Sequence, residues 1–214
     1  MSYPKMCSAL FAALAAGVVL VVASAASATV LCKTEISPCG SRYGAGSVIS
    51  DHLKTETISK IFSTNVNFPT FEIECDESTF NFKTTNEGGA TQTVTANTEA
   101  FTFGKCWFLH PFSSYTPPVL VKKPTLELHW SSGSNATITA KGIEFTLRNG
   151  PEDCVYGVLG GGSTAIAELK GGKPAQVWLN MELAKLSGFV CPAFMRWQAI
   201  YEVTSPNPLY AAAS

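Results

Sequence analysis

The sequence predicts an all-β fold, an antiparallel β-sandwich or barrel-like domain with disulfides. Three observations predict it. Apolar and polar residues alternate with a period of two in many short segments, clusters of Gly, Pro, Asn and Ser separate those segments, and six cysteines follow an apolar N-terminal run. Many short strands joined by regular turns in one domain favour two packed sheets or one closed sheet.

Residues 1–28 are typical of a secretory signal peptide, expected to be helical. One basic residue precedes an apolar run over residues 9–22, and small residues follow it, so cleavage is expected after Ala25 or Ala28. The apolar run is shorter than the roughly 20 residues that cross a bilayer, so no stable membrane span is expected after cleavage. Residues 29–214 are then expected to form a single secreted β-rich domain, extracellular or associated with the cell surface.

The cysteines predict three disulfides. One of the seven lies in the signal segment, and an even number in an exported chain is typical of a disulfide set, with fifteen possible pairings. Because short loops close most readily, the sequential pairing is expected, namely Cys32–Cys39, Cys75–Cys106 and Cys154–Cys191. Each bridge is expected to stabilise the fold by ~2–4 kcal/mol, mainly by restricting the unfolded chain.

Five segments show the alternation most clearly, and each is expected to be a strand with one face on a core. They are residues 70–75, 126–130, 143–148, 175–183 and 195–203. Residues 101–108 are apolar on both parities towards their end, which predicts a central strand covered on both faces.

The stretch from Glu152 to Thr164 combines a cysteine, a tyrosine and a run of glycines. A phosphate-binding loop would need Gly-Lys-Ser/Thr at the start of a helix, and a hydrolase elbow would need Gly-x-Ser-x-Gly. No lysine precedes Ser163, and an alanine stands where the elbow needs its last glycine. The stretch therefore predicts a strand carrying Cys154 and Tyr156, followed by a flexible glycine turn.

Composition excludes several classes of partner. Only 14% of the residues are charged, the formal net charge is −1, and no basic stripe exists, so neither nucleic acid nor an anionic membrane is an expected partner. His110 lies four residues after Cys106, but no Cys-x-x-Cys pair accompanies it. Because an oxidising compartment favours disulfides, neither a metal nor a cofactor is expected.

A tryptophan on the polar parity of its strand is the candidate binding residue. Trp178 lies between Val177 and Leu179, with Gln176 and Asn180 two residues away on the same face. An indole bordered by two amides is suited to stacking on a sugar ring or a peptide if that face meets solvent. The alternative is that a second sheet or a loop covers Trp178. By the same reasoning, Trp130 and Trp197 fall on apolar parities and are expected in the core.

No catalytic residue is assigned. Asp51 and His52 are neighbours, so they would point to opposite faces of a strand and cannot form a dyad. Carboxylates on the polar parities keep an extracellular glycoside or ester hydrolase open as the alternative, although exposed strands carry such residues routinely. They are Glu72, Glu74, Glu127 and Glu144. The stretch Leu109–Pro118, with two adjacent prolines, leaves an inhibitor-like loop as a third hypothesis.

Several motifs recur together in a known kind of protein. They are Leu31–Thr34, Cys75–Gly89, Phe101–Cys106, Gly172–Ala175 and Trp197–Tyr210. With them, the chain resembles a group of secreted, six-cysteine, β-rich proteins found in many paralogous copies in soil actinobacteria. No activity is attached to that group, so the resemblance implies compartment and architecture only. The function expected from the residues is non-catalytic binding of an extracellular glycan, such as cell-wall polysaccharide, or of an extracellular protein.

Overall fold

The protein is all-β, as the alternation predicts. The computed structural model describes residues 28–36, 38–64, 71–109, 112–149, 151–158 and 163–214, so nearly all of the expected signal segment, and the glycine turn at 159–162, lie outside the described residues. Within these ranges there are fifteen strands and no helix. The strands are β1 (Thr29–Cys32), β2 (Val48–Leu53), β3 (Ser59–Ser63), β4 (Glu72–Thr84), β5 (Val94–Leu109), β6 (Phe112–Tyr115), β7 (Val119–Lys122), β8 (Thr125–Trp130), β9 (Ala136–Lys141), β10 (Glu144–Asn149), β11 (Glu152–Gly157), β12 (Thr164–Lys170), β13 (Gln176–Ser187), β14 (Phe194–Ser205) and β15 (Tyr210–Ala213).

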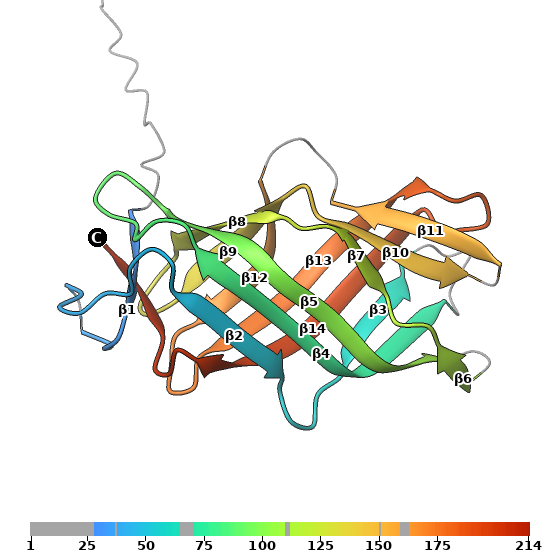
Figure 1. The fold of residues 1–214 in the computed structure, drawn as a ribbon, viewed down its shortest axis with the longest axis horizontal. Helices are drawn as coiled ribbons and strands as arrows, with labels where there is room; N and C mark the ends of the chain where they lie inside the picture. The colour runs from blue at the N-terminus through green and yellow to red at the C-terminus, as the bar shows by residue number, and fades with distance from the viewer. Residues whose placement is uncertain (1–27, 37, 65–70, 110–111, 150, 159–162) are drawn as a thin grey trace, which may run out of the picture.

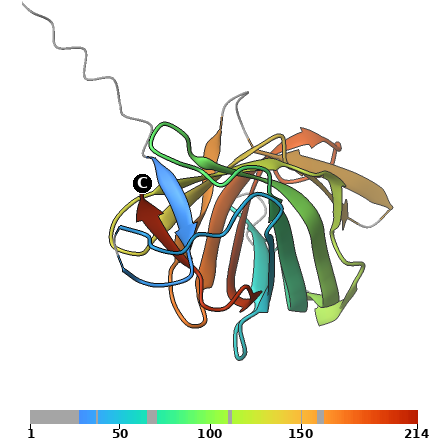
Figure 2. The same cartoon turned by 60° about the vertical axis from the view of Figure 1, so that its left-hand side comes forward.

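Eight antiparallel strands close into a barrel. The hydrogen-bonded order is β14-β3-β4-β5-β8-β9-β12-β13, and β13 pairs with β14 to complete the ring (Figure 1 and Figure 2). The strands β11, β10 and β7 continue the sheet from the end of β13, with Phe145 of β10 packed against the barrel residue Trp197, and β6 pairs with the end of β5. A separate two-stranded sheet joins β1 near the start of the described chain to β15 at its end.

The strands β2 and β3 share one position in the ring. Both pair with β14 on one side and with β4 on the other, β2 at one end of these long strands and β3 further along. Between them the chain leaves the sheet as a loop over residues 54–58, which projects from the barrel (Figure 1). The barrel therefore has one interrupted strand, and the interruption lies beside β14.

Large aromatic side chains fill the barrel interior. The ring of Trp197 lies 4.5 Å from that of Phe101 and 5.0 Å from that of Phe145, and Phe80 stacks on Phe101 at 4.7 Å. Trp197 is fully buried, and its indole N–H donates to the hydroxyl of Ser59 at 2.9 Å. Among the described residues, these side chains occupy the centre of the barrel.

The expectation that residues 101–108 are covered on both faces is wrong. Thr102 and Lys105 are exposed on the outer side of β5. At the end of this segment the apolar side chains pack against other aromatic residues. The rings of Phe71 and Phe108, for example, meet edge to face with their centres 5.3 Å apart.

Three disulfides connect the chain in sequential order, Cys32–Cys39, Cys75–Cys106 and Cys154–Cys191. The first closes the loop after β1, the second joins directly opposed residues of β4 and β5, and the third ties β11 to the connection between β13 and β14. Three disulfides are typical of an extracellular or otherwise oxidising environment.

Replacement of the central core residue tests the barrel interior. We expect Trp197→Ala to lower the free energy of unfolding by ~3–5 kcal/mol, because it removes the largest buried side chain and leaves a cavity. Trp178→Ala is the matched control, since Trp178 lies on the neighbouring strand with its side chain outside the barrel, and it should cost less than half as much. Urea denaturation followed by circular dichroism measures both, and equal losses would contradict the assignment of the two faces.

Candidate functional site

The alternation along β13 places Trp178 on the outer surface of the barrel. Val177 and Leu179 are buried, whereas 44% of Trp178 is exposed. The neighbouring strand β14 contributes Gln198 and Ile200 to the same face, because Asn180 pairs with Gln198 and Trp178 with Ile200 in the strand register. An indole, two amides and an aliphatic side chain therefore form a continuous outer surface across two strands.

The loop between β2 and β3 forms a wall beside this surface. Lys54 N–H donates to the carbonyl of Ile200 at 2.8 Å, and the hydroxyl of Thr57 donates back to the carbonyl of Lys54 at 2.6 Å. Glu56 takes a left-handed backbone conformation with φ of 64°, which lets the loop turn sharply. These bonds fix the loop to β14 at the edge of the exposed indole.

The loop and the outer surface of β13 and β14 together border an open groove of about 620 Å³. Its lining residues come from the loop and from β3, β13 and β14, and they are Glu56, Thr57, Ile58, Lys60, Trp178, Leu179, Asn180, Gln198, Ala199 and Ile200. Two of the three predicted binding residues, Trp178 and Asn180, thus line one groove. Gln176 is outside the lining and contacts Trp178 instead.

The indole of Trp178 is held in place from two directions. Its N–H donates to the side-chain oxygen of Gln176 at 2.9 Å, and the ammonium of Lys170 lies 4.4 Å from the ring centre. Lys170 also pairs with Glu168 at 3.2 Å. Lys170 comes from β12, which lies on the other side of β13 from β14, and its ammonium occupies one face of the ring. The ring is therefore fixed before any ligand binds, which reduces the entropy that binding costs.

Among the polar groups of the groove, the amides are uncharged and Lys60 is paired with carboxylates, whereas Glu56 on the loop adds a negative charge. The amide of Gln198 donates to that of Asn180 at 3.4 Å. The ammonium of Lys60 contacts the carboxylate of Glu72 and lies 3.8 Å from that of Glu74. An aromatic ring beside amides, with its lysine already paired, is suited to a neutral, hydroxyl-rich ligand rather than to an anion.

The carboxylates considered for hydrolysis lie on separate parts of the barrel. Glu72 and Glu74 share Lys60, and Glu144 on β10 pairs with Lys122 at 3.4 Å. Glu127 on β8 instead contacts Ser163 and His129.

Glu127 contacts both a serine and a histidine. The hydroxyl of Ser163 donates to its carboxylate at 3.2 Å, and Nε2 of His129 lies 3.4 Å from the same oxygen. In a catalytic triad the histidine lies between the serine and the acid, so that it can take the serine proton. Here the acid takes the middle place, so His129 does not activate Ser163 in this geometry.

The carboxyl group of Asp51 is buried, which its position in the sequence does not predict. Asp51 is 4% exposed and faces the interior, whereas His52 is exposed, as their adjacency on a strand requires. The carboxyl of Asp51 accepts the N–H of Phe80 at 2.7 Å, and Asp51 N–H donates to Asn81 Oδ1 at 3.1 Å. These bonds continue the contact between β2 and β4 beyond their ladder. Burial raises the pKa of Asp51 well above its ordinary value.

Two further sequence features fall partly outside the described residues. His110, whose spacing from Cys106 does not by itself predict a metal site, is not described, and among the described residues no group of three or more His, Cys, Asp or Glu is placed to hold a metal ion. The stretch Leu109–Pro118 contains β6, which pairs with β5, so much of it is a strand rather than a protruding loop. No helix long and apolar enough to cross a membrane occurs in the described ranges.

Comparison of the chain with protein-family models, with curated proteins and with solved structures finds no significant match. The function therefore has to be argued from the groove and from the residues around it.

The ionisation of Asp51 gives a pH-dependent prediction. Because burial raises its pKa in the folded state, its contribution to stability is complete below the unfolded value near 3.8 and is lost as the pH rises through the folded value. Asp51→Asn cannot ionise and keeps an acceptor for Phe80 N–H. We expect the variant to gain stability relative to the native protein between pH 4 and pH 8.

Urea unfolding of both proteins at pH 4, 6 and 8 measures this difference. Other titrating groups are common to the two proteins and cancel. A stability difference that stays constant over this pH range would contradict the raised pKa.

Proposed function

We propose that the protein is a non-catalytic β-barrel, secreted or held at the cell surface, that binds a neutral extracellular polysaccharide in the groove beside Trp178. The exposed, immobilised indole is the observation that carries the proposal. Sugar rings present flat C–H faces that pack on aromatic rings, and their hydroxyls pair with amide side chains. The groove supplies both, with Trp178 next to Asn180 and Gln198.

Two features support the extracellular location. The three disulfides are stable in an oxidising compartment, and residues 1–28 have the composition of a secretory signal. A cell-wall polysaccharide is then the neutral polymer that the domain meets first. An extracellular protein is the alternative ligand, since an exposed tryptophan also serves as an anchor in protein interfaces.

Co-sedimentation with insoluble neutral polysaccharides tests the proposal, and purified peptidoglycan, whose stem peptides carry carboxylates, is the charged comparison. We expect the native protein to bind at least one of these neutral polysaccharides, and Trp178→Ala to bind it about tenfold more weakly, which corresponds to ~1.4 kcal/mol. Gln198→Ala should weaken binding by a smaller factor. Phe189→Ala is the matched control, because Phe189 is an exposed aromatic residue away from the groove, and it should bind as the native protein does.

Two outcomes would count against this function. If Trp178→Ala binds as tightly as the native protein, the groove is not the site. If a chromogenic glycoside or ester is turned over, and Glu127→Gln abolishes that turnover, the protein is a hydrolase rather than a binding module.

A further inference from the structure

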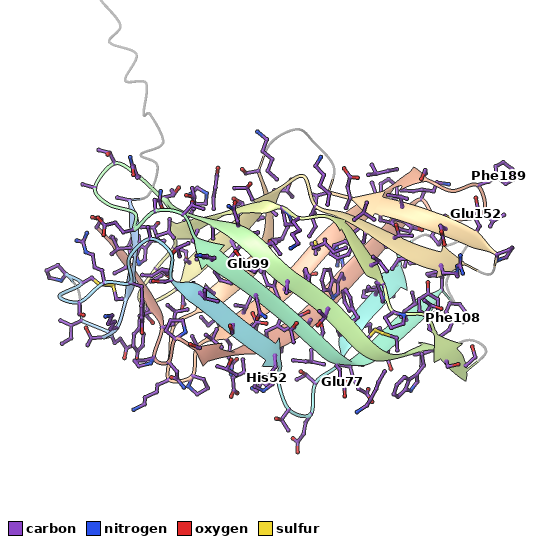
Figure 3. The ribbon with its side chains drawn as sticks, viewed as in Figure 1. His52, Glu77, Glu99, Phe108, Glu152 and Phe189 are labelled. Carbon is purple, nitrogen blue, oxygen red and sulfur yellow. A yellow bond between two sulfur atoms is a disulfide. The ribbon has the colours of Figure 1, made fainter. Side chains whose placement is uncertain are left out.

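A second exposed apolar feature lies at the tip of the hairpin that joins β13 to β14. Phe189 is 93% exposed, and Leu186, Val190 and Phe194 around it are 52%, 48% and 40% exposed. The nine residues 186–194 contain no charged side chain. Figure 3 shows Phe189 at one end of the long axis, with its side chain directed away from the barrel. We call residues 186–194 the hairpin tip.

The hairpin tip is held rigidly. The disulfide Cys154–Cys191 ties it to β11, and the carboxylate of Glu152 accepts the N–H groups of Phe189 and, at 3.0 Å, of Val190 (Figure 3 labels Glu152 and Phe189). Gly188 has a φ of 109°, and a Cβ atom there would lie 2.3 Å from the sulfur of Cys191, so this turn requires glycine. The exposed ring of Phe189 therefore projects from a fixed support.

Three carbonyl groups on the C-terminal side of the hairpin tip, those of Cys191, Pro192 and Ala193, are also bonded within the protein. The ammonium of Lys185 donates to the carbonyl of Cys191 at 3.1 Å, and the hydroxyl of Tyr156 donates to that of Pro192 at 2.9 Å. Lys185 N–H donates to the carbonyl of Ala193 at 2.9 Å. Moving an unpaired backbone group out of water is costly, but these groups need no water. Because the carboxylate of Glu152 and the ammonium of Lys185 are bonded to this backbone, the backbone belongs in the polar interface, and the exposed ring of Phe189 is the part suited to an apolar phase.

The surrounding charges favour a neutral surface as the partner. Arg148 pairs with Asp153 at 3.1 Å and Arg196 lies 3.7 Å from Glu182. The charge of Lys185 is balanced by Glu152, whose pKa is lowered by the backbone N–H groups of Val190 and Phe189 and by Lys185. Attraction to anionic lipids requires cations that are not already paired. The described residues around the hairpin tip supply no such cluster.

We propose that the hairpin tip is a peripheral membrane anchor that inserts Phe189 into the interface of a zwitterionic bilayer. A protein partner is the less favoured occupant, because protein interfaces use about one hydrogen bond per 100–200 Å² and the hairpin tip has already used the backbone groups named above internally. A bilayer requires no hydrogen bonds from an inserted side chain. This anchor is separate from the groove, which lies further along β13.

Sedimentation with phosphatidylcholine vesicles tests the anchor. The protein is the soluble form recovered from the medium of a secreting host, with its N-terminus determined by mass spectrometry. We expect Phe189→Ser to reduce vesicle binding about tenfold without a change in melting temperature, because the replaced ring is almost fully exposed. Ile36→Ser is the matched control, since Ile36 is 70% exposed in the loop closed by Cys32–Cys39, and it should bind as the native protein does.

A fluorescent variant reports insertion directly. Phe189→Trp should add an emission component that shifts to shorter wavelength with these vesicles, whereas Ile36→Trp should add one that does not shift. Inclusion of phosphatidylglycerol in the vesicles should not strengthen binding.

Three results would overturn the proposal. They are absence of binding to phosphatidylcholine vesicles, equal binding by the native protein and Phe189→Ser, and binding that requires anionic lipid. Absence of binding to phosphatidylcholine vesicles would favour an apolar pocket on another protein as the partner of the hairpin tip. Phe189 does not line the groove, so loss of vesicle binding by Phe189→Ser should leave polysaccharide binding by the same sample unchanged. The two proposals can therefore fail independently.

Discussion

The packing of Trp197 against Phe101 and Phe145 is the contact on which the rest of the structure depends. These rings come from β14, β5 and β10, which are far apart in the sequence, and they meet only when the barrel is closed. A filled interior favours apolar residues on the inward parity of the barrel strands, with Asp51 as an ionisable exception, and leaves the outward parity to carry polar side chains. Trp178 is outside for the same reason that Trp197 is inside.

The sequence predicts the elements well because strand alternation is a local signal. The alternating segment that begins at Leu126 lies in β8, and those that begin at Ala175 and Met195 lie mainly in β13 and β14. Closure into a barrel depends on pairing between distant strands, such as β14 with β3, and no local pattern encodes that partner. The sequence pattern therefore does not distinguish a β-sandwich from a β-barrel.

The candidate groove divides in the same way. Parity alone identifies Trp178, Gln176 and Asn180, because all three lie on one strand. Gln198 and Ile200 join them through the register of β13 with β14, and the wall comes from residues 54–58, more than a hundred positions earlier. The inward orientation of Asp51 cannot be predicted from the sequence either. A carboxylate on a strand normally faces solvent, and the hydrogen-bond partner of Asp51, Phe80, is 29 residues away.

The interrupted strand has a consequence for how this scaffold can change. The strands β2 and β3 are each bonded to both β14 and β4, so each end of the intervening loop is anchored independently. Surface loops tolerate insertions at small entropic cost when their ends are fixed. The loop of residues 54–58 can therefore change in length or in side chains while the barrel stays closed. A library built at these five positions alone would vary the lining of the groove on an unchanged framework.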